Sequence, residues 1–548
     1  MLSKFVRWLQ RRLFKQVPEE PFNLAEKATK PGRLKISSNL NNNLARLQEL
    51  YYRCDDTVMR RFEIGSGRLG GLIVYLEGFV DQDRVSEIMD GLMLLSRLTD
   101  PQCSKMKAEQ SFDLIVNQCL VAGETNLVEN LQQVTQGVFR GELALFINGV
   151  ARAVLIDLKG YEHRNVSIPE TEVVIRGPRE GFIEELVTNL ILLRRRIKGP
   201  QLKVEKIFLG EQSATAVAIT YVKGIADDKI VEEVRRRLKR IKIDAVLDSG
   251  YLEEYIEDAP YSPFPTVGNT EKPDVVAAKL LEGRVGILVD GSPFALTVPH
   301  LLVEAFQVSE DYYSRPFYAS MTRLIRIVAF MITLLLPAIY VAVQAYHPEM
   351  IPTILVVRMA GAREGIPFPA LLEAFLMLAI YELLKEAGLR MPRAVGQAVA
   401  IVGTLVLGEA AIRSGIVTPA MVIVVALTGI TGFVIPPESE SIAVLKFPLL
   451  FAGSFLGLFG VMLLVFVLVA HAVSLRSCGV PYTSPLAPAA YGEWKDVFIR
   501  APWPLLQRRP GVIDRQNLRR QPAEQTPQPS KGKSSRLPEK NEGSPDEF

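Results

Sequence analysis

The side chains in this sequence whose type and position could do chemistry are carboxylates inside apolar segments. Glu373 lies near the middle of the apolar run in REGIPFPALLEAFLMLAIYELLKE (363–386), and Glu409 lies in a second run at 394–412. A carboxylate that faces lipid costs roughly 3 kcal/mol even on permissive insertion scales, so such residues face protein or water. Both are intramembrane charge candidates, and Arg413 lies one helical turn after Glu409 as an ion-pair partner.

Other chemistries find no support. The four cysteines and four histidines are scattered without ligand spacing, which predicts no metal site and a reducing compartment. The stretch GSGRLG (65–70) matches GxGxxG, but a strand follows it where a dinucleotide site needs a helix, so a turn is predicted. No phosphate loop, nucleophile elbow or HExxH occurs, and 63 bases nearly balance 60 acids. We therefore expect no catalytic residues, no cofactor, no enzyme activity and no nucleic-acid binding.

The acidic residues belong to a block of long apolar runs. A bilayer core takes about 20 apolar residues of helix, and four runs in this block are long enough. The segment 363–386 is a fifth element, and two interpretations stay open: a re-entrant or protein-buried helix that could line a polar cavity, or an amphipathic helix lying flat at the interface. The four predicted spans are 327–345, 394–412, 416–435 and 447–475.

Arginines on both sides of this block predict the topology. They place both flanks in the cytoplasm, which needs an even number of crossings. Four spans satisfy this condition, with 363–386 not crossing. With four spans, the basic loop between the first two spans lies outside the cytoplasm, against the charge rule. A five-span alternative avoids this but places the basic C-terminus outside instead.

The first half of the chain contains an internal repeat. LIVYLEGFVDQDRVSEIM (72–89) resembles AITYVKGIADDKIVEEV (218–234), and LALFINGVARAVLI (143–156) resembles VGILVDGSPFALTV (285–298). The first pair reads as a strand leading into an amphipathic helix. The second reads as a hairpin on Asn-Gly or Asp-Gly. We predict two related α/β subdomains, joined by a helix over 176–199.

The N-terminus is basic and amphipathic. It predicts a helix that lies on an anionic membrane or packs on the protein's own soluble domain. The predicted fold class is an α/β cytoplasmic N-terminal domain of two related subdomains, followed by an all-α polytopic membrane domain. The predicted parts are the basic helix at 1–30, α/β subdomain 1 at 31–160, α/β subdomain 2 with the connecting helix at 161–315, the membrane domain at 316–475, a cytoplasmic C-terminal segment at 476–509 and a disordered tail at 510–548.

Seven stretches carry a family resemblance. The chain resembles the A subunit of the GerA-type spore germinant receptors from about residue 60 to 508, with Lys272 where the family usually has arginine. The stretches are RGPREGF (176–182), SPFPTVGNTEKPD (262–274), LLEGRVGILVDGSPFAL (280–296), SEDYYSRP (309–316), HPEMIP (347–352), AREGIPFP (362–369) and LRSCGVPY (475–482).

The resemblance implies a multi-pass protein of the inner spore membrane that triggers germination. It implies a transporter-like B subunit that holds the germinant, a C lipoprotein, and self-association in a ring, expected to be a pentamer, that forms a ligand-gated cation channel. A related stage-V sporulation membrane protein that assists ion release shares the architecture and stays open as an alternative. A membrane transporter subunit is a third interpretation.

The run at 394–412 carries a stripe of small and polar residues on one side. Such a stripe is either a close helix–helix contact or the lining of a water-filled pore. Packing is the better interpretation of a single helix, and the ring implied by the resemblance reverses that preference. We then expect Thr404 to face the pore and Glu373 to tune cation preference. The pore-lining candidates are Gln397, Ala400, Thr404, Gly408 and Ala411.

Overall fold

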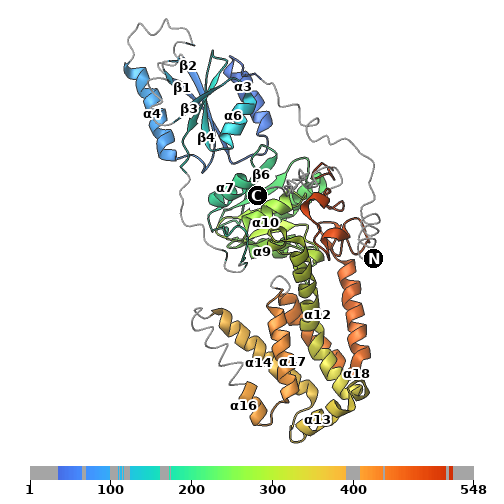
Figure 1. Cartoon of the computed structure of the whole chain (residues 1–548). Helices are drawn as coiled ribbons and strands as arrows, with labels where there is room; N and C mark the ends of the chain where they lie inside the picture. Colours follow the sequence, from blue (N-terminus) through green and yellow to red (C-terminus); the bar gives the residue numbers. More distant parts are fainter. Residues whose placement is uncertain are drawn as a thin grey trace, which may run out of the picture.

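The computed structural model describes most of the chain in three consecutive parts, two α/β subdomains and a helical bundle (Figure 1). This arrangement confirms the predicted fold class. Three predicted features lie outside the described residues. They are the basic helix at 1–30, most of the tail, and the pore candidates Gln397, Ala400 and Thr404. The residues that the structure describes are 35–64, 69–98, 109, 112–113, 115–116, 124–160, 169, 172, 174–390, 408–435, 439–513 and 517–522.

The first subdomain is one antiparallel sheet with helices packed against it. Its strand order is β1-β2-β4-β5-β3. The predicted hairpin is confirmed, because Leu143 pairs with Ile156 and Gly149 in the turn has a φ of 91° that favours glycine. The elements are α3 (Leu40–Leu50), β1 (Thr57–Ile64), β2 (Leu69–Leu76), α4 (Gln82–Leu98), β3 (Thr125–Val128), α6 (Leu131–Val138), β4 (Glu142–Ile147) and β5 (Ala153–Asp157).

The second subdomain repeats this topology. Its strand order is β6-β7-β9-β10-β8, so the strand-by-strand order matches the first sheet. The second predicted hairpin pairs Ile287 with Leu296. The duplication inferred from sequence is therefore confirmed. The elements are α7 (Leu186–Arg196), β6 (Leu202–Leu209), β7 (Thr215–Val222), α8 (Asp228–Arg240), α9 (Ser249–Ile256), β8 (Gly268–Thr270), α10 (Pro273–Leu280), β9 (Val285–Val289) and β10 (Ala295–Val298).

The connecting helix is shorter than predicted. It begins at Leu186, not at 176, because Gly177 has a φ of 137° and Pro178 follows it. Asn189 then fixes the approach to the helix, since its side chain accepts from Ile183 N at 2.9 Å and donates to Ile183 O at 2.5 Å. The segment before the helix is thus an irregular loop whose end is held by Asn189.

A buried ion pair joins the two subdomains. Arg194 of α7 donates from Nε and Nη2 to the two carboxylate oxygens of Asp56, at 2.7 and 2.8 Å. Its Nη1 donates to the carbonyls of Gly199 and Leu202. Because Asp56 precedes β1, this bidentate contact fixes the first sheet against the second.

The helical bundle follows directly from a short linker. In the described part of the chain, two helical segments are long and apolar enough by composition to cross a membrane, Pro316–Tyr346 and Glu440–Ser474, and the second contains a reversal at Gly457. The remaining elements are η3 (Leu302–Phe306), α11 (Glu310–Tyr313), α12 (Pro316–Tyr346), η4 (Pro348–Met350), α13 (Thr353–Arg363), α14 (Ala370–Arg390), α16 (Gly408–Arg413), α17 (Pro419–Gly432), α18 (Ser439–Ser474), β11 (Arg476–Ser477), β12 (Val480–Pro481), η7 (Trp494–Asp496) and η8 (Trp503–Leu505).

The prediction of one span over 447–475 is wrong, because α18 folds back on itself. Gly457 has φ 62° and ψ −150°, a non-helical conformation that suits glycine. A Cβ built on Gly460 would lie 2.3 Å from Ala452 O, and one on Gly453 would lie 3.1 Å from Val461. Residues eight apart in one straight helix could not approach so closely. Residues 439–456 and 458–474 are therefore two antiparallel arms of a hairpin.

The predicted span at 327–345 lies within α12, the one at 416–435 is shorter than expected, and most of the one at 394–412 lies outside the described residues. The run at 416–435 forms α17, whose 14 helical residues are fewer than a bilayer core requires. Of the run at 394–412, the structure describes only residues 408–412, at the start of α16. The helix α14, which occupies most of 363–386, packs against α12, α17 and α18 within the bundle.

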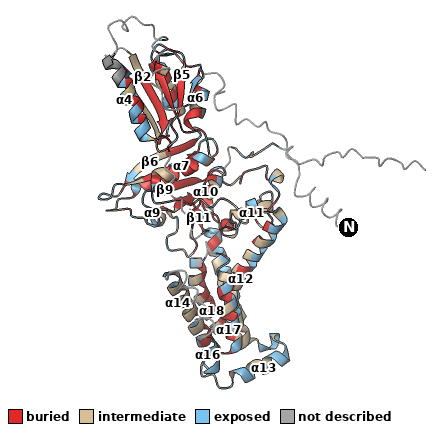
Figure 2. Ribbon diagram, turned by 60° about the vertical axis from the view of Figure 1, so that its left-hand side comes forward, coloured by how far each residue is buried: buried red, intermediate tan, exposed pale blue. Residues whose placement is uncertain are grey.

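The chain enters and leaves the bundle at the same end (Figure 1). The segment after α18 returns to the second sheet, where Ser477 Oγ accepts from His300 N at 2.9 Å. Contacts also continue beyond the predicted start of the tail at 510, because Ile513 is buried in the core of the second subdomain. Burial is dense in both sheets and sparser on the bundle, whose outward faces are apolar and exposed (Figure 2).

Candidate functional site: charged groups in the bundle and at its joint

Glu373 lies inside the bundle, bound to the start of a neighbouring helix. It projects from the first turn of α14 and is buried. Its Oε1 accepts from both the backbone N–H and the hydroxyl of Thr418, each at 2.5 Å. Thr418 is the N-cap of α17, and its Oγ1 in turn accepts from Met421 N at 3.2 Å. The carboxylate is thus part of the cap that starts α17.

The second oxygen of Glu373 has a weaker environment. Its Oε2 lies 3.9 Å from Arg363 Nη2 and has no hydrogen-bond partner among the described residues. The buried hydroxyl of Tyr340 on α12 lies in the same environment, near Thr418. In a single chain, then, Glu373 faces protein and not an open mouth, and its role in cation preference stays a prediction. A threonine followed by proline, as at 418–419, signals the start of a helix but does not indicate that Glu373 binds there.

A second buried charge pair was missed. Lys446 lies on the first arm of α18, residues 439–456, and is 2% exposed. It forms an ion pair with Glu382 of α14. Its ammonium also lies 5.6 Å from the centre of the Tyr381 ring. Beside the pair is a cavity of about 20 Å³, room for about one water. Lys446 immediately precedes the run at 447–475, so only spatial proximity reveals its partner.

The remaining candidates lie on the short helix α16. Glu409 and Arg413 form the predicted ion pair at 2.5 Å, and both side chains are exposed. From the predicted stripe, Gly408 is buried and Ala411 is half-buried. The structure therefore does not bring Glu409 together with Glu373 in one site.

A third group of charges joins the bundle to the α/β domain. Arg323 of α12 is fully buried, and its Nε lies 3.2 Å from Asp311 Oδ2. Its Nη1 donates to the main-chain oxygen and Oδ1 of Asp496, at 2.5 and 3.2 Å. Arg326 makes a bidentate contact with Asp311 at 2.6 and 2.9 Å. We call these four residues the ionic joint.

The surroundings of the ionic joint make its charges interdependent. Burial raises the pKa of Asp496, and Arg323 opposes that rise. Burial and the nearby Asp496 raise the pKa of Tyr312, whose hydroxyl donates to Asp496 Oδ2 at 3.1 Å. The joint therefore links α11, α12 and the segment after α18 through one shared set of charges.

These groups place paired charge inside the bundle and at its joint with the α/β domain. Among the described residues no three His, Cys, Asp or Glu side chains cluster as metal ligands. A match to the model of the Bacillus/Clostridium GerA spore germination protein family covers residues 45–512. The chain belongs to the GerA family.

Relatives of this GerA-family chain resemble it along most of their length. It is 43% identical to the uncharacterized membrane protein YfkQ of Bacillus subtilis (strain 168), over 88% of this chain and 93% of that protein. It is 40% identical to spore germination protein KA of the same strain, over 90% of each. It is 31% identical to that strain's stage V sporulation protein AF, over 82% of this chain and 90% of the relative.

A solved structure also matches. The N-terminal domain of the A subunit of the Bacillus megaterium spore germinant receptor GerK3 is 36% identical, with 49% of this chain and 97% of that chain covered and a TM-score of 0.39. Together with the apolar helix α12 and the apolar arms of α18, the membrane-protein relatives indicate that this GerA-family protein is membrane-associated.

Proposed function

We propose that this GerA-family protein is the A subunit of a nutrient germinant receptor that triggers spore germination. It acts in the inner membrane of the spore, with the α/β domain and both termini in the cytoplasm. It assembles as a ring, a pentamer, that forms a ligand-gated cation channel. A transporter-like B subunit holds the germinant, and a C lipoprotein completes the complex.

One observation carries this proposal. The similarity to spore germination protein KA extends over 90% of both chains and so includes the α/β subdomains and the bundle together. The bundle also holds buried charge at Glu373 and at the Lys446–Glu382 pair, and charged groups within membrane domains either mark ion pathways or pair with each other. The ionic joint supplies a physical link between a signal received by the α/β domain and the first helix of the bundle.

A second candidate rests on a specific similarity. The relation to stage V sporulation protein AF also covers most of both chains, at 31% identity. A protein of that kind would assist ion release during sporulation without responding to nutrient. The ionic joint and the buried pairs are compatible with either role. The two roles must therefore be distinguished by experiments on spores.

The deciding experiment deletes the gene in its own spore-forming host. We expect dormant spores to form normally and to lose their response to at least one nutrient, with the response restored by the intact gene. Normal nutrient responses in spores that fail to complete sporulation would favour the second candidate. For the channel, the purified complex is reconstituted into vesicles that contain a potassium-sensitive dye. Germinant-dependent flux is expected, and its absence in a correctly assembled complex would contradict channel activity.

A further inference from the structure

The first three turns of α12 carry an apolar stripe that nothing in the described chain covers. Phe317 is 92% exposed, and Met321, Ile325 and Val328 are each about half exposed. Their spacing of four, four and three residues places them on one face of the helix. The stripe runs on without a break into the apolar run at 327–345.

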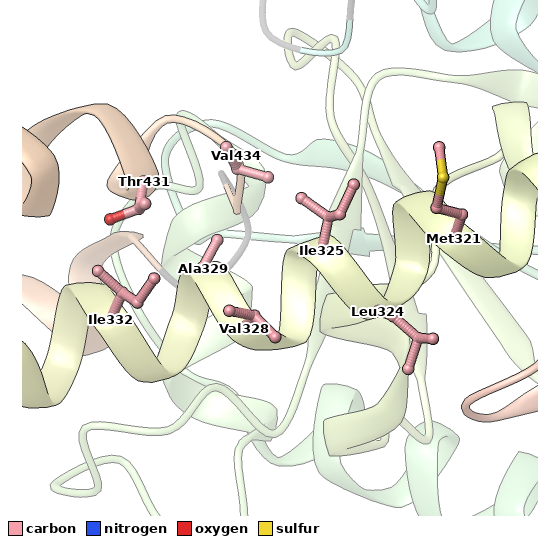
Figure 3. Close-up of a pocket in the computed structure, with 8 residues that line it drawn as sticks. All are labelled: Met321, Leu324, Ile325, Val328, Ala329, Ile332, Thr431 and Val434. Atoms are coloured by element: carbon pink, nitrogen blue, oxygen red, sulfur yellow. The ribbon is translucent and has the colours of Figure 1, made fainter.

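A shallow groove continues the stripe toward α17. Its volume is about 330 Å³, and Thr431 and Val434 face α12 across it (Figure 3). Nearly all its surface is hydrocarbon. The lining residues are Met321, Leu324, Ile325, Val328, Ala329, Ile332, Thr431 and Val434.

The charges on the same three turns point away from this stripe. Arg323 and Arg326 lie between the stripe residues in sequence, yet the ionic joint buries the first and largely covers the second. Basic residues just before a span ordinarily reach into water or toward headgroups. Here Asp311 and Asp496 neutralise them inside the protein, so the exposed face carries no charge.

The length of α12 matches a whole bilayer. Its 31 residues span about 46 Å at 1.5 Å per residue, against about 30 Å for the hydrocarbon core and 40–45 Å including headgroups. A helix of this length reaches through both interfaces. Its first turns would then lie at headgroup depth on the α/β side.

Aromatic side chains occur at that depth. Tyr318 is 56% exposed, and Trp503, 45% exposed, is held to α11 by its Nε1, which donates to Tyr312 O at 3.2 Å. The backbone N–H of Arg500 donates to Ser320 Oγ at 3.0 Å and holds the same segment against the second turn of α12. Tyrosine and tryptophan are enriched at membrane–water interfaces, because one end is apolar and the other forms hydrogen bonds.

We propose that the exposed face of residues 317–328 and Trp503 form a collar embedded in the bilayer interface. The partner of this surface is lipid. The membrane boundary on this face lies near Phe317, about ten residues earlier than the apolar run at 327 indicates. The α/β domain therefore rests directly on the bilayer surface and does not stand off on a helical stalk.

The test uses tryptophan fluorescence in the full-length protein reconstituted into phosphatidylcholine–phosphatidylglycerol vesicles. The chain has three tryptophans, Trp8, Trp494 and Trp503. The double variant Trp8→Phe/Trp494→Phe leaves Trp503 as the reporter. A variant with all three replaced by phenylalanine then receives either Leu324→Trp or, as the matched control, Tyr261→Trp, since Tyr261 is fully exposed on the α/β domain.

Vesicles with lipids brominated near the headgroup end of the acyl chain are compared with unbrominated ones. We expect Trp503 and Leu324→Trp to lose about half of their emission, as side chains at the interface should. We expect Tyr261→Trp to keep its emission and to be quenched by aqueous iodide.

Two results would overturn the proposal. Iodide quenching of Leu324→Trp without bromine quenching would place the stripe in water. Protection of Leu324→Trp from both quenchers would mean that protein covers it, as in an interface with a second copy of this chain. Because Trp503 is a native side chain, its response decides the question even if the introduced tryptophan disturbs folding.

Discussion

Arg323, about two turns into α12, donates from Nη1 to the main-chain oxygen of Asp496 at 2.5 Å and to its Oδ1 at 3.2 Å. The helix that enters the bundle is therefore tied to the segment that leaves it. Asp496 is far from Arg323 in sequence, and no sequence pattern near either residue predicts that they form a pair. Movement of the α/β domain at this point must displace α12 or break a buried ionic contact.

The first prediction concerns the stability of this joint. Arg323→Met leaves the buried Asp496 without its cation, and breaking a buried pair from one side typically costs 3–5 kcal/mol. We expect the free energy of unfolding in detergent to fall by roughly that amount. Adding Asp496→Asn should recover part of the loss, because the orphaned charge is then removed. Arg315→Met, an exposed arginine just before α12, is the matched control and should change stability little.

The second prediction concerns the hairpin of α18. Gly457→Ala places a Cβ 3.2 Å from the side chains of Tyr346 and His347, in a conformation that L-residues rarely adopt. We expect a loss of roughly 1–3 kcal/mol in stability. Gly388→Ala on α14 is the control, because a Cβ there meets nothing within 4 Å and should stabilise the helix slightly. Equal stability of the two variants would mean that residues 439–474 form one continuous helix.

The third prediction concerns pH. Burial, together with the charge of Glu257, raises the pKa of Glu253 in α9 to about 7. A carboxyl whose folded pKa is raised stabilises the fold below its unfolded pKa of about 4.3, and that contribution is lost as the pH rises through 7. Glu253→Gln should therefore match the wild type at pH 4.5 and melt at higher temperature than it at pH 8. Glu254→Gln, an exposed neighbour on α9, should show no such growing difference.

Local features of the fold could be predicted from the sequence, and long-range ones could not. The hairpins at Asn148-Gly149 and Asp290-Gly291 follow from two-residue turn chemistry, which acts over a few residues. Gly457 lies in a continuous apolar stretch, and hydropathy alone does not show that the chain reverses there. The predicted span there failed for that reason.

The same distinction holds for the candidate site. Glu373 and Glu409 stand out because a charge inside an apolar run is visible in one dimension. The ion pair of Arg413 with Glu409 follows from their spacing of four residues, one turn of helix. Lys446 and Thr418 could not be paired with their glutamates, because 64 and 45 residues separate the partners.

The fourth prediction concerns ion passage and the two roles that Glu373 could have. Its carboxylate caps α17 through Thr418, so a change in flux after mutation could come from lost charge or from a lost cap. Glu373→Gln separates these, because the amide oxygen can still accept from Thr418 while the charge is gone. We expect lower cation flux through the reconstituted complex with its assembly intact. Thr418→Val is the matched variant, since it keeps the charge of Glu373 and removes the hydroxyl that it binds. Reduced flux in Thr418→Val and normal flux in Glu373→Gln would show that the cap matters and the charge does not.

The pore stripe is tested in the same vesicles. A Thr404→Cys variant should be blocked by a water-soluble thiol reagent if Thr404 faces the pore, because the side chain then contacts the water through which ions pass. The wild type, treated with the same reagent, controls for the native cysteines, of which Cys54 and Cys478 are buried. If flux through Thr404→Cys persists after treatment, the stripe that includes Gly408 and Ala411 is a packing contact between helices. The pore must then be lined by another helix. Because Glu373 binds the start of α17, α17 is the next helix to test.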